Sequence, residues 1–197
     1  RGRQKMAYTV VADRDELQAL ANSLSEINVE LDRIEIPELV LLRLLEGGSN
    51  KLNVGLTELS SSSVEMDSQN QMVIVIGRQR GFLAVDADHA LYLSRSLDIS
   101  DNTLQSDGNA FSANGHIDNF ILEIQRSRDY FESQIGKGTI GRILLAPLNS
   151  DASLLSDAIY ERLGARVELL DHSYVTDFKL ASDGAEALLL ASAAQAA

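Results

Sequence analysis

The fold of this chain is decided by the stretch Ile117-Asp-Asn-Phe-Ile-Leu-Glu-Ile-Gln-Arg-Ser-Arg-Asp-Tyr-Phe-Glu-Ser-Gln-Ile135. Its apolar residues recur at helical spacing, and a helix would place six of them on one face: Ile117, Phe120, Ile121, Ile124, Phe131 and Ile135. Gly136 follows, and glycine accepts the positive φ that ends many helices. The stretch therefore predicts a long helix that packs one face on a hydrophobic core.

Arg128 interrupts this apolar stripe. Its aliphatic stem can pack among the apolar side chains while the guanidinium reaches solvent. Alternatively, Arg128 forms a buried ion pair with a carboxylate of a neighbouring sheet. We favour the first interpretation, because long basic side chains commonly bury their stems.

Composition limits the classes of function. The chain has 197 residues, 45% of them hydrophobic, so it can bury one core or one core and part of a second. Its formal net charge of -12 argues against nucleic acid as a partner, because an acidic surface repels phosphates. No apolar run approaches the ~20 residues that span a bilayer, so direct membrane insertion is not expected. Cysteine is absent, which excludes disulfides and thiolate metal sites.

Residues 1–48 are predicted to form a βαβα segment. The β-branched run at residues 8–12 predicts a buried strand, and Asp13 starts a helix of the pattern Asp-x-x-Glu. A second strand is predicted at residues 31–36. Pro37 then opens a helix that ends at the following Gly-Gly pair, since proline lacks only an N–H that the first helical turn does not use. Alternation of strands and helices indicates a parallel sheet.

Residues 49–71 are polar and rich in serine, and we interpret them as an insertion loop between two structural halves. Within this loop, residues 54–59 could instead order as an added strand against the sheet or a partner.

Residues 72–197 carry a different order of elements. The continuous apolar run at residues 72–76 predicts a central strand buried on both faces. Two more strands follow through tight turns, and then a polar connection at residues 98–115 leads to the long helix. Further elements are predicted at residues 142–146 (strand), 151–163 (helix), 166–170 (strand) and 185–196 (helix). The order βββαβαβα predicts an α/β domain of the ribonuclease H-like fold.

Four parts of the sequence resemble one family in the same order, and the first of them is the strand-helix-strand-helix order of residues 8–45. Glu123-Ile-Gln-Arg-Ser-Arg-Asp-Tyr-Phe131 resembles the Glu-Ile-Arg-Arg-Ser-Leu-Asp-Phe-Phe helix of PilM-type proteins, which are actin-like components of type IV pilus assembly. The strand Ala90-Leu-Tyr-Leu-Ser-Arg95 and the strand Arg142-Ile-Leu-Leu-Ala146 are also similar to that family. Within it, the MSHA pilus biogenesis proteins (MshI type) are the most similar branch. The resemblance implies an actin-like ATPase fold, with residues 1–48 ending the first subdomain and residues 72–197 forming the second.

The sequence departs from the nucleotide-binding pattern that this resemblance implies. Actin-like ATPases use Asp-x-Gly at the first hairpin to organise hydrated Mg²⁺, and this chain has Val75-Ile76-Gly77. Relatives use a Gly-Gly-Gly turn after the fourth strand, where this chain has Ala146-Pro-Leu-Asn149. The helix positions that contact adenosine in relatives correspond to Gln125, Arg126 and Asp129. If the site is retained, Gly77 and these three residues would bind nucleotide; no catalytic residue or metal ligand is assigned.

We interpret the other residues that could take part in catalysis or metal binding as structural. Asp86-x-Asp88 lies at a predicted hairpin turn, where aspartate is favoured for its local hydrogen bonds. His89, His116 and His172 have no spacing typical of metal ligands. Gly136-Lys-Gly138 lacks the glycine spacing of a phosphate-binding P-loop.

Two functions follow. The favoured one is a catalytically silent actin-like scaffold without a cofactor, working in type IV (MSHA-type) pilus biogenesis. The resemblance implies a cytoplasmic protein that is peripheral to the inner membrane. It would bind the PilN-like cytoplasmic tail of an inner-membrane assembly protein and other platform components, and homo-oligomerisation is left open.

The alternative function is an ATPase that binds ATP and Mg²⁺ through a phosphate loop upstream of Arg1. The chain starts without an initiator methionine or a signal-like segment, so we expect it to belong to a longer soluble protein.

Overall fold

The computed structural model describes residues 7–42, 70–106, 110–146, 148, 151–170, 184 and 189. The chain divides into two compact units, Arg1–Ile34 and Glu35–Ala197. The predicted final helix at residues 185–196 lies outside the described residues except for Leu189, which is helical. Most of the predicted insertion, including its residues 54–59, also lies outside them, as does His172.

Among its described residues, the first unit contains one helix, α1 (Arg14–Glu26). Asp13 caps it as predicted, because its Oδ1 accepts hydrogen bonds from the N–H groups of Asp15 at 2.8 Å and Glu16 at 3.1 Å. The predicted strands at residues 8–12 and 31–36 are wrong: both segments lack regular secondary structure, and most of their side chains are exposed. A β-branched run becomes a strand only where a neighbouring strand takes its backbone groups, and the described sheet gives these segments no such neighbour.

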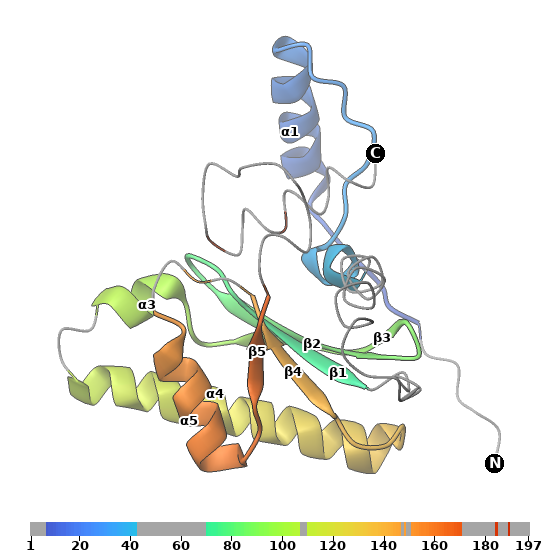
Figure 1. Cartoon of the computed structure of the whole chain (residues 1–197). Helices are drawn as coiled ribbons and strands as arrows, with labels where there is room; N and C mark the ends of the chain where they lie inside the picture. The colour runs from blue at the N-terminus through green and yellow to red at the C-terminus, as the bar shows by residue number, and fades with distance from the viewer. Residues whose placement is uncertain are drawn as a thin grey trace, which may run out of the picture. The chain divides into compact units, whose positions relative to one another are not determined.

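The second unit contains a five-stranded mixed sheet in the order β3-β2-β1-β4-β5 (Figure 1). Its strands are β1 (Gln71–Ile76), β2 (Gly81–Ala87), β3 (Ala90–Leu97), β4 (Arg142–Leu145) and β5 (Val167–Leu169). The first three strands form the predicted antiparallel meander, and β4 and β5 extend the sheet in parallel on the other side of β1. This is the strand order that the predicted βββαβαβα arrangement requires.

The described part of this unit includes the helices α3 (Asp101–Ser106), α4 (Ala110–Tyr130) and α5 (Ser153–Leu163), and a π-helical turn, η1 (Phe131–Ile135), continues α4. The polar connection predicted at residues 98–115 is therefore largely helical, which corrects the sequence interpretation. Gly136 ends the long helix as predicted, with φ 67° and an N–H that donates to the carbonyl of Phe131 at 3.0 Å. The helix predicted to begin at Pro37 is present over residues 37–42, where the described segment ends.

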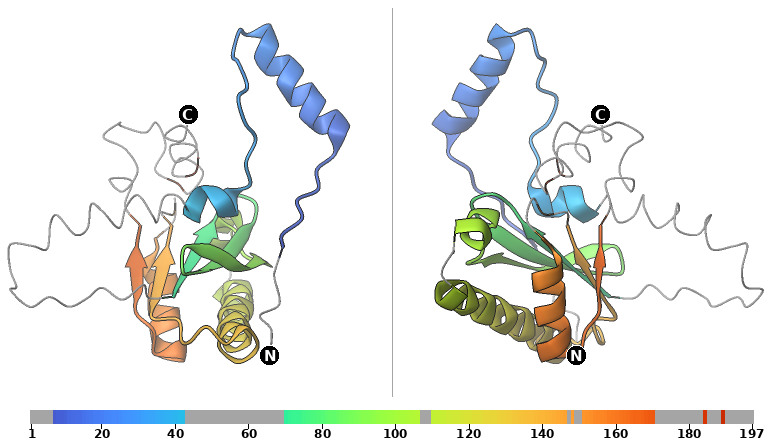
Figure 2. Two further views of the ribbon diagram at one scale, coloured as in Figure 1. Left: turned by 90° about the vertical axis from the view of Figure 1, so that its right-hand side faces the viewer. Right: turned by 60° about the vertical axis from the view of Figure 1, so that its left-hand side comes forward.

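The sheet separates two hydrophobic clusters. On one face α4 and α5 pack on the sheet, and on the opposite face lies the helix of residues 37–42 (Figure 2). The central strand β1 sends Met72, Ile74 and Ile76 into the first cluster and Val73 and Val75 into the second. This confirms the prediction of a central strand buried on both faces.

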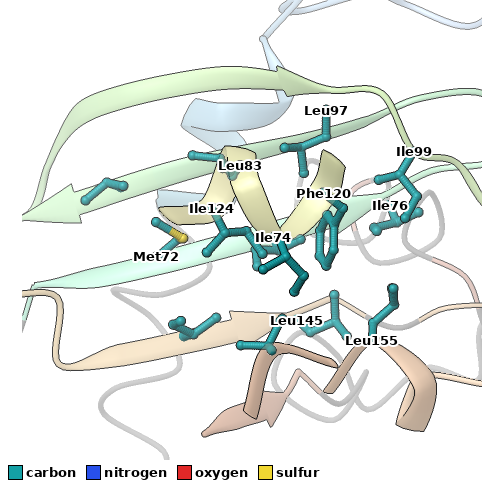
Figure 3. Packing of buried hydrophobic residues seen from close by; sticks show 14 of the residues in the cluster. Met72, Ile74, Ile76, Leu83, Leu97, Ile99, Phe120, Ile124, Leu145 and Leu155 are labelled. Carbon is teal, nitrogen blue, oxygen red and sulfur yellow. The ribbon is translucent and has the colours of Figure 1, made fainter. Parts of the chain in front are cut away.

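The apolar stripe of α4 fills the larger cluster. Figure 3 shows Phe120 and Ile124 of α4 beside Ile74 of β1 and Leu145 of β4. Ile124 and Phe131 are fully buried, as the helical spacing predicted. Full burial of one such side chain contributes about 1.5–3 kcal/mol, so this stripe is what holds α4 on the sheet.

Candidate functional site

The turn after β1 is the first candidate site, because the sequence comparison with actin-like ATPases places their phosphate hairpin there. Gly77 opens the turn, and its N–H donates to the carbonyl of Arg80 at 3.0 Å. Val75, which stands where those ATPases have an aspartate, is 2% exposed and packs in the second hydrophobic cluster. An apolar core side chain cannot organise a hydrated Mg²⁺ ion, so the residues at this turn do not fit that cofactor. No group of three or more acidic or histidine side chains that could hold a metal occurs among the described residues.

The outer face of α4 carries the three predicted adenosine-contacting residues. Gln125, Arg126 and Asp129 are all exposed. Arg126 donates to Glu123 Oε1 at 2.8 Å, and the backbone carbonyl of Asp129 accepts from Ser133 Oγ at 2.6 Å. These contacts are local to the helix, so the three residues belong to an exposed polar surface.

Gly77 lies beside the start of α3, whereas the α4 positions lie in the half of that helix that leads away from α3. The first residue of α3, Asp101, donates its N–H to the carbonyl of Gly77 at 2.9 Å, so the chain leading into α4 starts beside this turn. The segment that leaves α4 lies beside the start of β1, where Asn70 Nδ2 donates to the carbonyl of Lys137 at 2.9 Å. Gln125 and Asp129 belong to the second half of the 21-residue α4. Within the described part of the chain, no hydrogen bond or ion pair joins Gly77 to these helix positions.

Glu123 connects α4 to the sheet. Its carboxylate accepts from Arg95 Nη1 of β3 at 3.2 Å and from Arg126 Nη1 at 2.8 Å. The two guanidinium groups, Arg126 first and Arg95 second, hold the pKa of Glu123 below its usual value against the opposing effect of partial burial. An ion pair therefore joins the helix to the sheet, but it is not the buried pair of Arg128 that the sequence analysis considered: the carboxylate belongs to the helix, the arginine is Arg95 of the sheet, and the side chains of Arg95 and Glu123 are 32% and 29% exposed.

Arg128 has no ion pair in the described part of the chain, and its side chain is half-buried. This arrangement fits the interpretation in which its stem packs and its charge reaches solvent. The fully buried residue at this level of α4 is Ser127, whose Oγ donates to the carbonyl of Glu123 at 2.6 Å. The apolar periodicity did not identify Ser127, because a serine satisfied by its own helix is buried without being apolar.

The segment after β4 is the third candidate element. Ala146 is fully buried, and its N–H donates to the carbonyl of Ile74 at 2.9 Å. Leu148 packs against the first hydrophobic cluster. Both side chains are used in packing, at positions where the resemblance to nucleotide-binding proteins implies glycines. Residues 147 and 149 lie outside the described residues.

Comparisons with known proteins give no match to any family model and none to a curated protein. Solved structures do match. The PilM chain of a PilM–PilN type IV pilus biogenesis complex has a TM-score of 0.65 and 14% identity, over 92% of this chain and 58% of that chain. MreB 5 of Spiroplasma citri bound to AMPPNP has a TM-score of 0.52 and 13% identity, over 93% of this chain and 64% of that chain.

This chain has an actin-like fold. At these identities the likeness concerns the fold alone, and the chain spans 58% of the length of the PilM chain that it matches. Among the described residues, no helix combines the length and the apolar composition that crossing a bilayer requires.

The remaining sequence candidates of this actin-like chain have separate structural roles. Asp86 is 6% exposed and its Oδ2 accepts from Gln71 Nε2 at 3.0 Å, whereas Asp88 pairs with Lys137 Nζ at 2.5 Å. The two carboxylates therefore have different partners and do not share a site. Lys137 also lies 5.0 Å from the centre of the Tyr92 ring, and Asp88 first and Tyr92 second raise the pKa of this lysine.

Sequence reasoning missed the start of α3, which contacts the candidate turn. Ser100 and Thr103 form reciprocal hydrogen bonds: Ser100 N–H donates to Thr103 Oγ1 at 2.9 Å, and Thr103 N–H donates to Ser100 Oγ at 3.2 Å. The signal was present as Ser-x-x-Thr, a variant of the capping box in which a hydroxyl replaces the usual Glu or Gln.

Proposed function

We propose that this chain is a catalytically silent, PilM-like component of type IV pilus biogenesis, of the MSHA type. The single observation that carries the proposal is the likeness of fold to the PilM chain, which extends over 92% of this chain. The residues that resemble PilM-type proteins lie mainly in α4, β3 and β4, and each of these elements contributes side chains to the larger core.

Catalytic silence is supported by what occupies the three candidate elements. Val75 is a core residue, the described side chains after β4 (Ala146 and Leu148) are packed, and Gln125, Arg126 and Asp129 of α4 are exposed. An ATPase needs preorganised charge around the phosphates; Val75, Ala146 and Leu148 supply none, and the charge of Arg126 is engaged by Glu123.

The proposed partner is the cytoplasmic tail of a PilN-like inner-membrane protein. The solved PilM chain was determined in a complex with PilN, which supports this class of partner. The formal net charge of -12 favours a basic juxtamembrane tail, because opposite charges steer association. The protein would then act on the cytoplasmic side, peripheral to the inner membrane through this partner and other platform components.

The proposal is tested by titrating the full chain with the cytoplasmic tail peptide of the PilN-like protein from the same genome. We expect saturable binding that weakens as salt rises, because exposed charges are screened. A scrambled peptide of equal charge is the matched control and should bind more weakly. Equal binding of both peptides, or of neither, would contradict the proposed partner.

The second candidate function is an ATP-binding actin-like ATPase whose phosphate loop lies upstream. Its support is the likeness to MreB 5, which was solved with a nucleotide analogue. Calorimetry with Mg·ATP separates the two functions. The scaffold predicts no measurable heat of binding, whereas saturable micromolar affinity that Arg126→Ala abolishes would favour the ATPase.

A further inference from the structure

The turn at residues 77–80 is held by the amino-terminal end of α3. The N–H of Asp101 donates to the carbonyl of Gly77 at 2.9 Å, and the N–H of Asn102 donates to the carbonyl of Arg78 at 3.3 Å. We call this pair of hydrogen bonds the α3 clasp. It connects two segments that are more than twenty residues apart in the sequence, and it fixes the turn from outside its own hairpin.

The clasp supplies hydrogen-bond partners to backbone N–H groups of α3 and to backbone carbonyl groups of the turn. The first N–H groups of a helix have no partner within the helix. In α3 the first two donate to the turn, and the third, from Thr103, donates to Ser100 Oγ at 3.2 Å. The positive end of the helix dipole also faces the partial negative charge of the two carbonyl oxygens. Asp101 is 2% exposed, so its hydrogen bond to Gly77 is largely withdrawn from solvent, whereas the second hydrogen bond joins two exposed residues.

Gly81 shows that the chain itself occupies the space beside this turn. A Cβ atom on Gly81 would lie 3.0 Å from the carbonyl oxygen of Ile99 and 3.1 Å from that of Val75. A side chain at this position would press on two backbone carbonyl groups, because the segment leading into α3 passes closely over the first residue of β2. In a ligand-binding hairpin, the same absence of a side chain would let a ligand approach the backbone. Here the approaching group is the protein's own carbonyl.

We propose that the α3 clasp is an internal substitute for a ligand at this turn. The clasp keeps the turn in one conformation, so its order does not depend on a bound phosphate or nucleotide. This inference rests on the proposed non-catalytic function and deepens it, since it gives the reason why an actin-like domain can keep this hairpin ordered without its cofactor. The chemistry involved is hydrogen bonding alone.

The test compares two substitutions of Asp101 in the full chain. Asp101→Pro removes the N–H that donates to Gly77, and proline is tolerated at the first position of a helix. Asp101→Ala is the matched control, because it also removes the carboxylate but keeps the N–H. Hydrogen–deuterium exchange in residues 76–81 should be about fivefold faster in Asp101→Pro than in Asp101→Ala, which is the change in opening equilibrium expected for one typical hydrogen bond. Exchange in α5 serves as the internal reference for global stability.

A second arm examines the unmodified protein with ligands. Inorganic phosphate, pyrophosphate and Mg·ATP should each leave the exchange of residues 76–81 unchanged. Equal exchange in the two Asp101 variants, or protection of the turn by any of these ligands, would overturn the inference. If Asp101→Pro does not fold, Ser100→Ala takes its place in the test. This substitution removes the hydroxyl that accepts from the N–H of Thr103 at the start of α3, so it should still raise exchange at the turn relative to the unmodified protein. Failure of tail-peptide binding would contradict only the proposed partner and would leave this result unchanged.

Discussion

Replacing Glu123 by glutamine is predicted to weaken the attachment of α4 to the sheet by a small, pH-dependent amount. Glu123→Gln keeps the size and the hydrogen-bonding shape of the side chain but removes its charge. Two interactions lose strength: the contact with Arg95 at 3.2 Å and the contact with Arg126 at 2.8 Å. The side chains of Glu123 and Arg95 are 29% and 32% exposed, and that of Arg126 is 59% exposed, so solvent screens both pairs.

The magnitude follows from this exposure. A partly exposed pair contributes about 0.2–1 kcal/mol, and a helical i,i+3 pair about 0.2–0.5 kcal/mol. The free energy of unfolding should therefore fall by roughly 0.5–1.5 kcal/mol at pH 7. For a chain of this size, that corresponds to a decrease in melting temperature of about 1–6 °C.

The difference in stability between wild type and Glu123→Gln should depend on pH. The pKa of Glu123 is lowered in the folded protein from an ordinary value of 4.5, so its contribution to stability is present above that value. The contribution is lost as the pH falls through the lower, folded pKa. Wild type and Glu123→Gln should therefore differ in melting temperature at pH 7 and converge in strongly acidic solution, provided that the domain is still folded there.

The assay is thermal and urea unfolding of both proteins across this pH range, together with Arg95→Gln and the double variant. The double-mutant cycle isolates the coupling between Glu123 and Arg95. A difference that persists undiminished below the folded pKa would refute the electrostatic reasoning. So would a coupling energy of zero, since the helix–sheet ion pair would then contribute nothing.

Three further predictions follow from the same structure. Arg128→Leu should leave the melting temperature unchanged or raise it; a loss of about 3–5 kcal/mol would show that Arg128 is a buried ion-pair partner after all. Gly81→Ala should cost about 1–3 kcal/mol, because its Cβ would meet two carbonyl oxygens at 3.0 and 3.1 Å, whereas the control Gly115→Ala meets nothing within 4 Å and should stabilise α4 by about 0.5–1 kcal/mol. Equal melting temperatures for these two glycine variants would contradict the close approach at Gly81. Replacing residues 49–69 by a short Gly/Ser linker should leave folding intact, since loop length costs little free energy; if pilus assembly in cells also persists, the insertion is not the docking element. The replacement stops before Asn70, whose side chain bonds the carbonyl of Lys137, and unfolding by circular dichroism measures all three.

The sequence by itself determined the elements whose signal is local. Apolar residues at helical spacing fixed the buried face of α4, and Gly136 marked its end. The unbroken apolar run of β1 fixed a strand buried on both faces. These features depend on residues within a few positions of one another, so a periodic pattern records them directly. The order of such elements was then sufficient to predict the five-stranded arrangement, because few topologies are compatible with it.

Only the tertiary structure decided which local preferences were realised and which distant groups meet. Residues 8–12 have the composition of a strand, yet a strand forms only with a partner, and partners are not encoded locally. The pairing of Glu123 with Arg95 joins positions 28 apart, and the α3 clasp joins Asp101 to Gly77. In each case the chemistry of the residue was visible in the sequence, but its partner was set by the folding of the meander against α3 and α4. The hydrogen bonds that hold the candidate turn in this actin-like domain therefore come from residues distant in the sequence.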